Sequence, residues 1–360
     1  MSADARLILV AKAVAAELRA DEVSLLSTES SASPGSFTQE EIFALSPAFS
    51  NLYADLIEAI KPLLTARGVP SEAAGVILRD AAPTAAHLAL DRAMRLSRFI
   101  AARGRGGLAV SSPAQPAAYA RPEALRDAAV SSREFNEFII GRLAPAVGLP
   151  AAEWRPSPQT PVLAAGIGKI NYNFHGRGLM RRLRGRVYRL AARLWPGKAP
   201  ALSLSYATDV LQDSGFFGFG FLEYVRGRVA FPPSTASPTA RAELAQVLEA
   251  FTPRFEAFFP AGEDRTALSR AVAAVFVEVF PSDALEGAAA HHRAASEFLE
   301  GFPPTALMMS ETGNVEATFL LAAARARGLE TIGMQEGGTP VMKTIMSRVM
   351  RWSTRSSTVT

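Results

Sequence analysis

The stretch from Thr305 to Gly338 constrains the fold more than any other part of the chain. Its apolar runs predict a strand, a helix and a second strand, over 305–309, 315–327 and 330–334. Gly328 stands where a glycine commonly ends a helix. A strand, a helix and a strand joined by short loops predict a right-handed βαβ unit, and such a unit implies a parallel sheet.

Two further apolar runs, Pro161–Ile167 and Ala201–Tyr206, predict more strands of the same sheet. Helical periodicity dominates the first 150 residues, with little sign of alternating strands and helices. The elements expected there are helices over 5–19, 38–61, 71–100 and 132–143, and a short strand over 108–112. Further helices are expected over 240–259, 265–280 and 284–299, and a loop or strand edge over 213–221.

We therefore expect an α/β protein with three regions. These are a mostly helical N-terminal region over 1–150, a Rossmann-like parallel-sheet domain over 151–340, and a basic Ser/Thr-rich tail over 341–360. Hydrophobic residues make up 49% of the 360-residue chain and charged residues 20%, which suffices for a core. The absence of cysteine excludes disulfides and thiolate metal sites, and four histidines leave little for another metal site. No apolar run reaches the ~20 residues of a spanning helix, so the expected location is cytoplasmic.

Positive charge is concentrated in one segment although the net charge is only +4. Nine basic residues and no acidic residue lie between Lys169 and Lys198. Leucine and valine recur at helical spacing over 178–194, which predicts an amphipathic helix with a basic face. The cations expected on that face are Arg181, Arg184 and Arg189. Such a face suits an anionic membrane surface or the phosphates of a ligand, and a core helix with a solvated face fits the same pattern.

The predicted parallel sheet also indicates where a ligand would bind. In open α/β sheets the ligand crevice lies outside the carboxyl ends of the strands, and glycines there let the backbone approach an anion. The expected substrate-binding residues are Ser310, Asn314, Gln335, Gly337 and Gly338, with Gly168 and Lys169 after the strand that begins at Pro161. Glu336 is the candidate catalytic residue, acting as a general base. Plain turns without a ligand are the competing interpretation of these residues.

The segment LMMSETGNVEATFLLAAARARGLETIGMQEGGTP, residues 307–340, resembles part of the GT-B glycosyltransferase superfamily. The resemblance is strongest to bacterial surface-polysaccharide transferases, in which such a unit ends in Gln-His-Gly, often with a further glycine. Gln335, Gly337 and Gly338 match that turn, whereas Glu336 stands in place of the histidine. Two helical segments, LDRAMRLSRFI and SREFNEFIIGRLA, resemble the N-terminal region of surface-carbohydrate transferases.

This resemblance implies the N-terminal, acceptor-side half of a GT-B fold. The implied reaction is sugar transfer from a nucleotide sugar to a glycan or a lipid-linked acceptor. No metal or other cofactor is expected, since the chain has no Asp-x-Asp motif. The resemblance also implies a second Rossmann-like half that holds the donor. Residues 339–360 are too few to form it, so we expect a truncated chain or one that needs a partner.

The leading hypothesis is therefore a glycosyltransferase-like protein of surface-polysaccharide biosynthesis, cytoplasmic or peripheral at the inner membrane. The alternative is a non-catalytic basic protein that binds an anionic membrane through residues 177–195. Nucleic acid is the less favoured partner of that segment, and its binding would weaken steeply with salt. A third hypothesis is a degenerate protein without activity.

Overall fold

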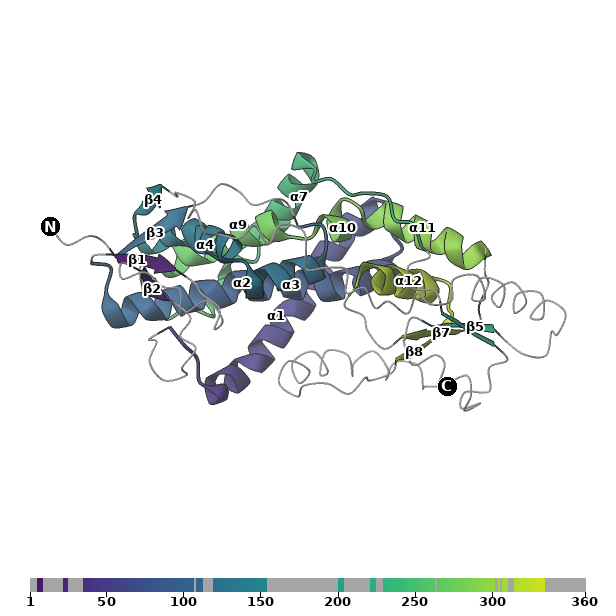
Figure 1. The fold of residues 1–360 in the computed structure, drawn as a ribbon, viewed down its shortest axis with the longest axis horizontal. Coiled ribbons are helices and arrows are strands. Elements are labelled where there is room, and N and C mark those ends of the chain that lie inside the picture. The colour runs from purple at the N-terminus through teal and green to yellow at the C-terminus, as the bar shows by residue number, and fades with distance from the viewer. Residues whose placement is uncertain are drawn as a thin grey trace, which may run out of the picture.

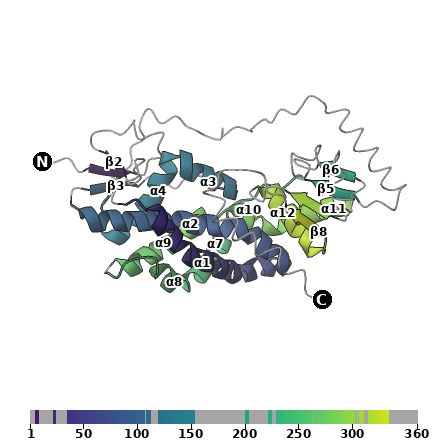
Figure 2. The same ribbon diagram turned by 90° about the horizontal axis from the view of Figure 1, so that it is seen from below.

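The computed structural model describes residues 5–8, 22–24, 35–106, 108–112, 119–153, 200–203, 221–224, 229–262, 264–301, 304, 306–309 and 314–333. The molecule is elongated, with a parallel sheet at each end of its long axis and helices between the two sheets (Figure 1). Seen from below, helix α2 (Ser71–Arg103) runs along the middle of the molecule from one sheet toward the other (Figure 2). The described part of the chain is thus an α/β structure in which helices predominate.

The first sheet contains β1 (Ala5–Ile8), β2 (Glu22–Ser24), β3 (Leu108–Ser112) and β4 (Ala151–Glu153). Its strands are all parallel and lie in the order β2-β1-β3-β4. Ala5 lies opposite Leu108, and Val110 lies opposite Ala151. Helix α4 (Arg133–Leu143) packs against β3, and the 3-10 turn η2 (Ala144–Val147) continues from it.

The second sheet contains β5 (Pro200–Ser203), β6 (Phe221–Tyr224), β7 (Ala306–Met309) and β8 (Glu330–Gly333). It is also entirely parallel, in the order β6-β5-β7-β8. All four residues of β7 are buried, as expected for a central strand of a parallel sheet. In each sheet the second strand along the chain lies on one side of the first strand, and the third lies on the other side. This change of direction places a topological switch point between β1 and β3 and another between β5 and β7.

Two long helices form the centre of the molecule. Helix α1 (Gln39–Ala66) starts at a capping box, in which the Thr38 hydroxyl accepts a bond from the Glu41 amide at 3.2 Å and the Glu41 carboxylate accepts one from the Thr38 amide at 2.8 Å. Helix α2 has 33 residues and is about 50 Å long. It contacts α1 on one side and α9 (Arg265–Val279) and α12 (Val315–Ala326) on others. Its many alanines let these neighbours approach closely, because an alanine adds little side-chain bulk.

The remaining helices complete the core, some of them against α2 and others against α9 and α12. They are α3 (Pro122–Ser131), α7 (Pro238–Glu249), α8 (Thr252–Glu256), α10 (Ser282–Leu285) and α11 (Ala288–Gly301). Their buried side chains and those of α1, α2, α9 and α12 belong to one continuous hydrophobic cluster. None of the helices in the described ranges combines the length and the apolar composition that a membrane span requires.

Ion pairs inside this helical core hold polar side chains at the helix contacts. Asp91 on α2 accepts bonds from Arg95 at 2.9 and 3.0 Å and a further, short one from Arg92. Arg92 in turn donates to Asn136 on α4 at 3.2 and 3.3 Å. Arg241 and Glu286 form a second buried pair, in which the guanidinium also donates to two backbone carbonyls. These pairs are satisfied on several sides, which offsets the cost of burying their charges.

The C-terminal βαβ prediction is confirmed. Strands β7 and β8 are parallel, with Ala306 opposite Glu330, and α12 lies between them in sequence. The expected strand at 201–206 is present as β5 and pairs with β7, also in parallel. Phe221, the last residue of the expected loop or strand edge, begins β6. The expected strand at 161–167 and the basic helix at 178–194 lie outside the described residues.

The prediction for the N-terminal region was wrong in one respect. A helix was expected over 5–19, but residues 5–8 form strand β1, and the region carries a four-stranded parallel sheet that its helical periodicity did not reveal. Helix α1 also continues through Pro62 to Ala66, since Ile60 and Leu64 are fully buried on its inner face. The helix expected over 240–259 is divided into α7 and α8, and the helix expected over 284–299 into α10 and α11.

Candidate functional site where three helices meet

The candidate site lies where α2, α3 and the first turn of α12 meet. Helix α12 begins shortly after β7, so its first turn lies on the carboxyl side of the strand next to the switch point between β5 and β7. Ligand crevices of open parallel sheets lie on this side. Asn314 is the expected binding residue that the structure describes. It is the N-cap of α12, and its Oδ1 accepts a hydrogen bond from the Ala317 amide at 2.9 Å.

Glu123 brings a carboxylate from another helix to the same place. It lies in the first turn of α3, which starts with Pro122, and its Oε1 accepts a hydrogen bond from the Val315 amide at 3.4 Å. Its other oxygen, Oε2, is buried and has no hydrogen-bond partner. Burial raises the pKa of Glu123 above its ordinary value, despite hydrogen bonds from its own amide and that of Val315 and despite nearby arginines. The first turns of α3 and α12 therefore share one carboxyl group.

Asp80 on α2 supplies a second carboxylate. Its Oδ1 accepts a hydrogen bond from Arg126 Nη1 at 2.6 Å, and the same nitrogen donates to the Thr84 hydroxyl at 3.3 Å. Asp80 and Thr84 are four residues apart on α2, and Glu123 and Arg126 are three apart on α3, so each pair lies on one helix face. Asp80 Oδ2 is buried without a partner, and burial raises the pKa of Asp80 although Arg126 opposes this shift.

This arrangement places two carboxyl groups beside a cation and a helix N-terminus. Two carboxyl groups with pKa values raised by burial each keep one oxygen free of protein partners, and a raised pKa makes a carboxylate a better proton acceptor. Arg126 carries a positive charge on the same face of α3 as Glu123, and the N-terminus of α12 favours negative charge. Within the described ranges, no group of three or more His, Asp and Glu side chains is placed to hold a metal ion.

Asp80 and Glu123 were missed by sequence reasoning. They belong to different helices and form no motif with each other. The local signal for Glu123 is Pro122 followed by an acid, which is typical of a helix start. The residues expected to bind substrate next to Asn314, together with the basic face, lie outside the described residues, and their roles stay predictions: Gly168, Lys169, Arg181, Arg184, Arg189, Ser310, Gln335, Glu336, Gly337 and Gly338.

A serine, an aspartate and a histidine also lie together around α10, but their hydrogen bonds are structural. Ser234 donates to Asp283, whose carboxylate is nearly fully buried, and it shares a 3.0 Å bond with Ser282. His291 Nε2 lies 2.7 Å from the Pro232 carbonyl oxygen and 4.0 Å from Asp283 Oδ1, and among the described residues it has no hydrogen bond to the serine hydroxyl. The cluster therefore fastens the segment before α7 onto α10 and α11 and lacks the serine–histidine bond of a nucleophile.

Comparisons of the chain with models of protein families, with curated proteins and with solved structures find no match.

Proposed function

We propose that this protein is a glycosyltransferase-like enzyme of surface-polysaccharide biosynthesis. It would transfer a sugar from a nucleotide sugar to a hydroxyl of a glycan or a lipid-linked acceptor. The observation that carries the proposal is the pair of buried carboxyl groups, Asp80 and Glu123, beside the helix that follows β7 at a switch point. The resemblance of residues 307–340 to GT-B transferases supports the same reaction.

In the proposed reaction the acceptor hydroxyl attacks the anomeric carbon of the donor. The bond from that carbon to the nucleotide phosphate breaks, and the hydroxyl proton passes to a carboxylate. Glu123 is suited to accept that proton, because burial raises its pKa and Oε2 has no protein partner. Glu336 is the competing candidate for this role and follows β8, which lies next to β7 in the sheet. Arg126 would hold the Asp80 carboxyl group in place through its hydrogen bond to Oδ1.

The second parallel sheet supports a two-substrate reaction within one chain. The sheet of β1 to β4 has the same strand order as the sheet of β5 to β8, and hence a switch point of its own. A donor and an acceptor would each have a parallel sheet against which to bind.

The test compares three carboxylate variants of the full chain. Glu123→Gln and Glu336→Gln keep the shape of the side chain but cannot accept a proton. Glu134→Gln is the matched control, because Glu134 is an exposed residue in the first turn of α4. Transfer from a panel of nucleotide sugars to a lipid-linked acceptor is measured by release of the nucleotide. We expect Glu123→Gln to lower the rate about 100-fold or more, with the control unchanged.

Two results would contradict parts of the proposal. If Glu336→Gln abolishes transfer and Glu123→Gln does not, the enzyme assignment stands and the base is Glu336. If calorimetry shows that no nucleotide sugar binds and no transfer occurs with the panel, the enzyme assignment fails.

A further inference from the structure

A cavity of about 420 Å³ lies between the C-terminal end of α2, η2 and the start of α9. Its size is within the range of small-molecule sites in proteins. Ser97 lies about 25 Å along α2 from Asp80, so this cavity is separate from the candidate site. Arg105, which lines the cavity, stands three residues before the start of β3. The cavity therefore lies at the amino end of that strand. Ligands of the proposed transfer reaction would bind at the opposite, carboxyl end.

The cavity has an apolar side and a charged rim. Ile100, Val147, Phe259 and Leu268 contribute apolar side chains that are almost fully buried. At the rim, Gly104 and Gly262 leave open space where a larger residue would carry a Cβ. Two arginines and one aspartate line the cavity, which gives its lining a formal charge of +1.

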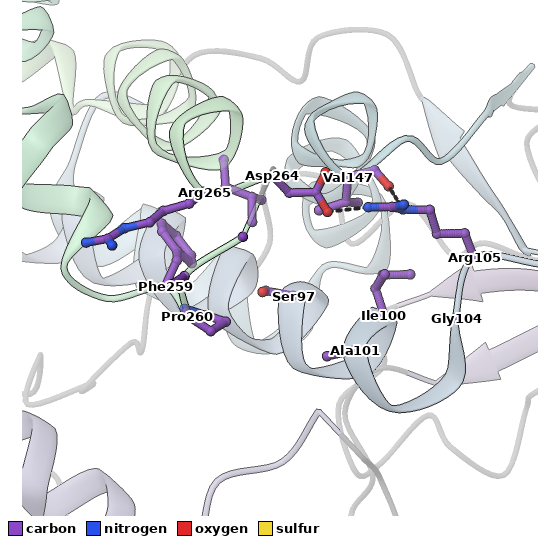
Figure 3. A pocket seen from close by; sticks show the side chains of 13 residues that line it. Ser97, Ile100, Ala101, Gly104, Arg105, Val147, Phe259, Pro260, Asp264 and Arg265 are labelled. Carbon is purple, nitrogen blue, oxygen red and sulfur yellow. Dashed lines mark hydrogen bonds and ion pairs between the residues drawn. The ribbon is translucent and has the colours of Figure 1, made fainter.

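Arg105 is the cation that is held in place at the rim. Its Nε donates to the Val147 carbonyl at 2.5 Å, and its Nη2 pairs with Asp264, as Figure 3 shows. The Arg105 side chain is still 50% exposed, so a ligand can reach it. Arg265 also lines the cavity, but its guanidinium points away from Arg105 (Figure 3). A guanidinium oriented by a backbone carbonyl is suited to bind a carboxylate or phosphate through two hydrogen bonds.

Asp264 can leave Arg105 at low cost because the N-terminus of α9 offers its carboxylate a second positive partner. It stands at the N-cap position of α9, where its side chain makes no capping bond while it pairs with Arg105. A carboxylate at a helix N-terminus is stabilised by the helix dipole and by first-turn amides. An anion that took over Arg105 would therefore displace Asp264 onto α9 without leaving a charge unpaired.

We propose that this cavity binds a small amphiphilic anion, that is, a phosphate or carboxylate head on an apolar body. The head pairs with Arg105 in place of Asp264, and the body lies against Ile100, Phe259 and Leu268. This site does not depend on the proposed transferase activity, because its residues belong to neither the carboxylate pair nor the β7–α12 junction. Binding involves no covalent step.

Phenyl phosphate is the probe for the whole ligand. Inorganic phosphate represents the anionic head alone, and benzyl alcohol represents the apolar body alone. Titration calorimetry on the full chain gives affinities, and the methyl signals of Ile100 and Leu268 report occupancy by NMR. We expect phenyl phosphate to bind more tightly than either fragment and to shift both methyl signals. Arg105→Gln should weaken its binding about tenfold.

Asp264→Asn is the decisive variant, because it removes the competitor of the ligand and keeps a good N-cap residue. It should strengthen phenyl phosphate binding about threefold, the scale of an exposed ion pair. The control is Arg103→Gln, which removes an exposed charge from the end of α2 without altering the cavity lining. It should leave the affinity for phenyl phosphate unchanged. The proposal is overturned if phenyl phosphate does not bind, if inorganic phosphate binds as tightly, or if Asp264→Asn weakens binding.

Discussion

Replacing Asp91 with asparagine tests how much the ion pairs of α2 contribute to stability. Asp91 lies among Arg92, Arg95 and His87, and 13% of its side chain is exposed. Burial alone would raise the pKa of its carboxyl, but the charges of Arg92, Arg95 and His87 outweigh burial and lower the pKa from 3.8 to about 2. One pKa unit corresponds to ~1.36 kcal/mol, so the ionised carboxylate contributes about 2 kcal/mol at neutral pH.

The sign of the pH dependence follows from the direction of the shift. A carboxyl group whose pKa is lower in the folded state stabilises the fold above its unfolded pKa, and this contribution disappears as the pH falls through the folded value. We therefore expect Asp91→Asn to lower the free energy of unfolding by about 2 kcal/mol at pH 7. At pH 3 the difference from wild type should shrink to about 1 kcal/mol.

The measurement is urea unfolding followed by helical circular dichroism at both pH values. Asp55→Asn is the control, because Asp55 also pairs with an arginine, Arg254, but both side chains are at least 40% exposed. We expect that control to change stability by less than about 0.5 kcal/mol. The reasoning is refuted if Asp91→Asn costs the same at pH 3 as at pH 7, or if it costs no more than Asp55→Asn.

Three further predictions concern local features, each checked by urea unfolding. Gly287→Ala should lower the free energy of unfolding by about 1–3 kcal/mol, because the new Cβ would lie 2.8 Å from Ser234 Cβ and 3.2 Å from Asp283 Cα. Gly75→Ala, whose Cβ would have nothing within 4 Å, should instead raise the free energy of unfolding by about 0.5–1 kcal/mol. Thr38→Ala should cost about 1 kcal/mol through loss of the capping box, and an unchanged stability would show that the start of α1 does not depend on it. Glu123→Gln should stabilise the fold relative to wild type at pH 7 and not below pH 4.5. The reason is that a carboxyl group whose pKa is raised in the folded state destabilises that state once it is ionised. A loss of stability at pH 7 would contradict this.

The C-terminal βαβ unit could be predicted because its signals are local. β7 is a run of four apolar residues, Asn314 caps α12, and Gly328 ends that helix with a positive φ of 68° that favours glycine. The first sheet carries no such signal. β1 has four residues and pairs with β3 about 100 residues later in the chain, so its identity depends on distant partners. Over the same residues the spacing of apolar side chains fits a helix equally well.

The candidate site was predictable only in part, for the same reason. The rule that ligands bind at the carboxyl ends of parallel strands led to Asn314, which the structure places at the start of α12. Asp80 and Glu123 reach that place because α2 and α3 pack against each other and against the start of α12. A carboxylate in a helix gives no sign in the sequence of whether it will be buried, since that depends on which helix covers it.

The central position of α2 has a consequence for how the protein folds as it is synthesised. The helix is complete at Arg103, but α12, one of its main partners, begins at Val315, roughly 210 residues later. At the usual 5–20 residues per second, the ribosome needs about 10–40 s to supply that partner. During this interval the part of α2 that α12 will cover stays open to water and to other nascent chains. Expression at lower temperature or with a chaperone that shields apolar segments should therefore increase the yield of folded protein.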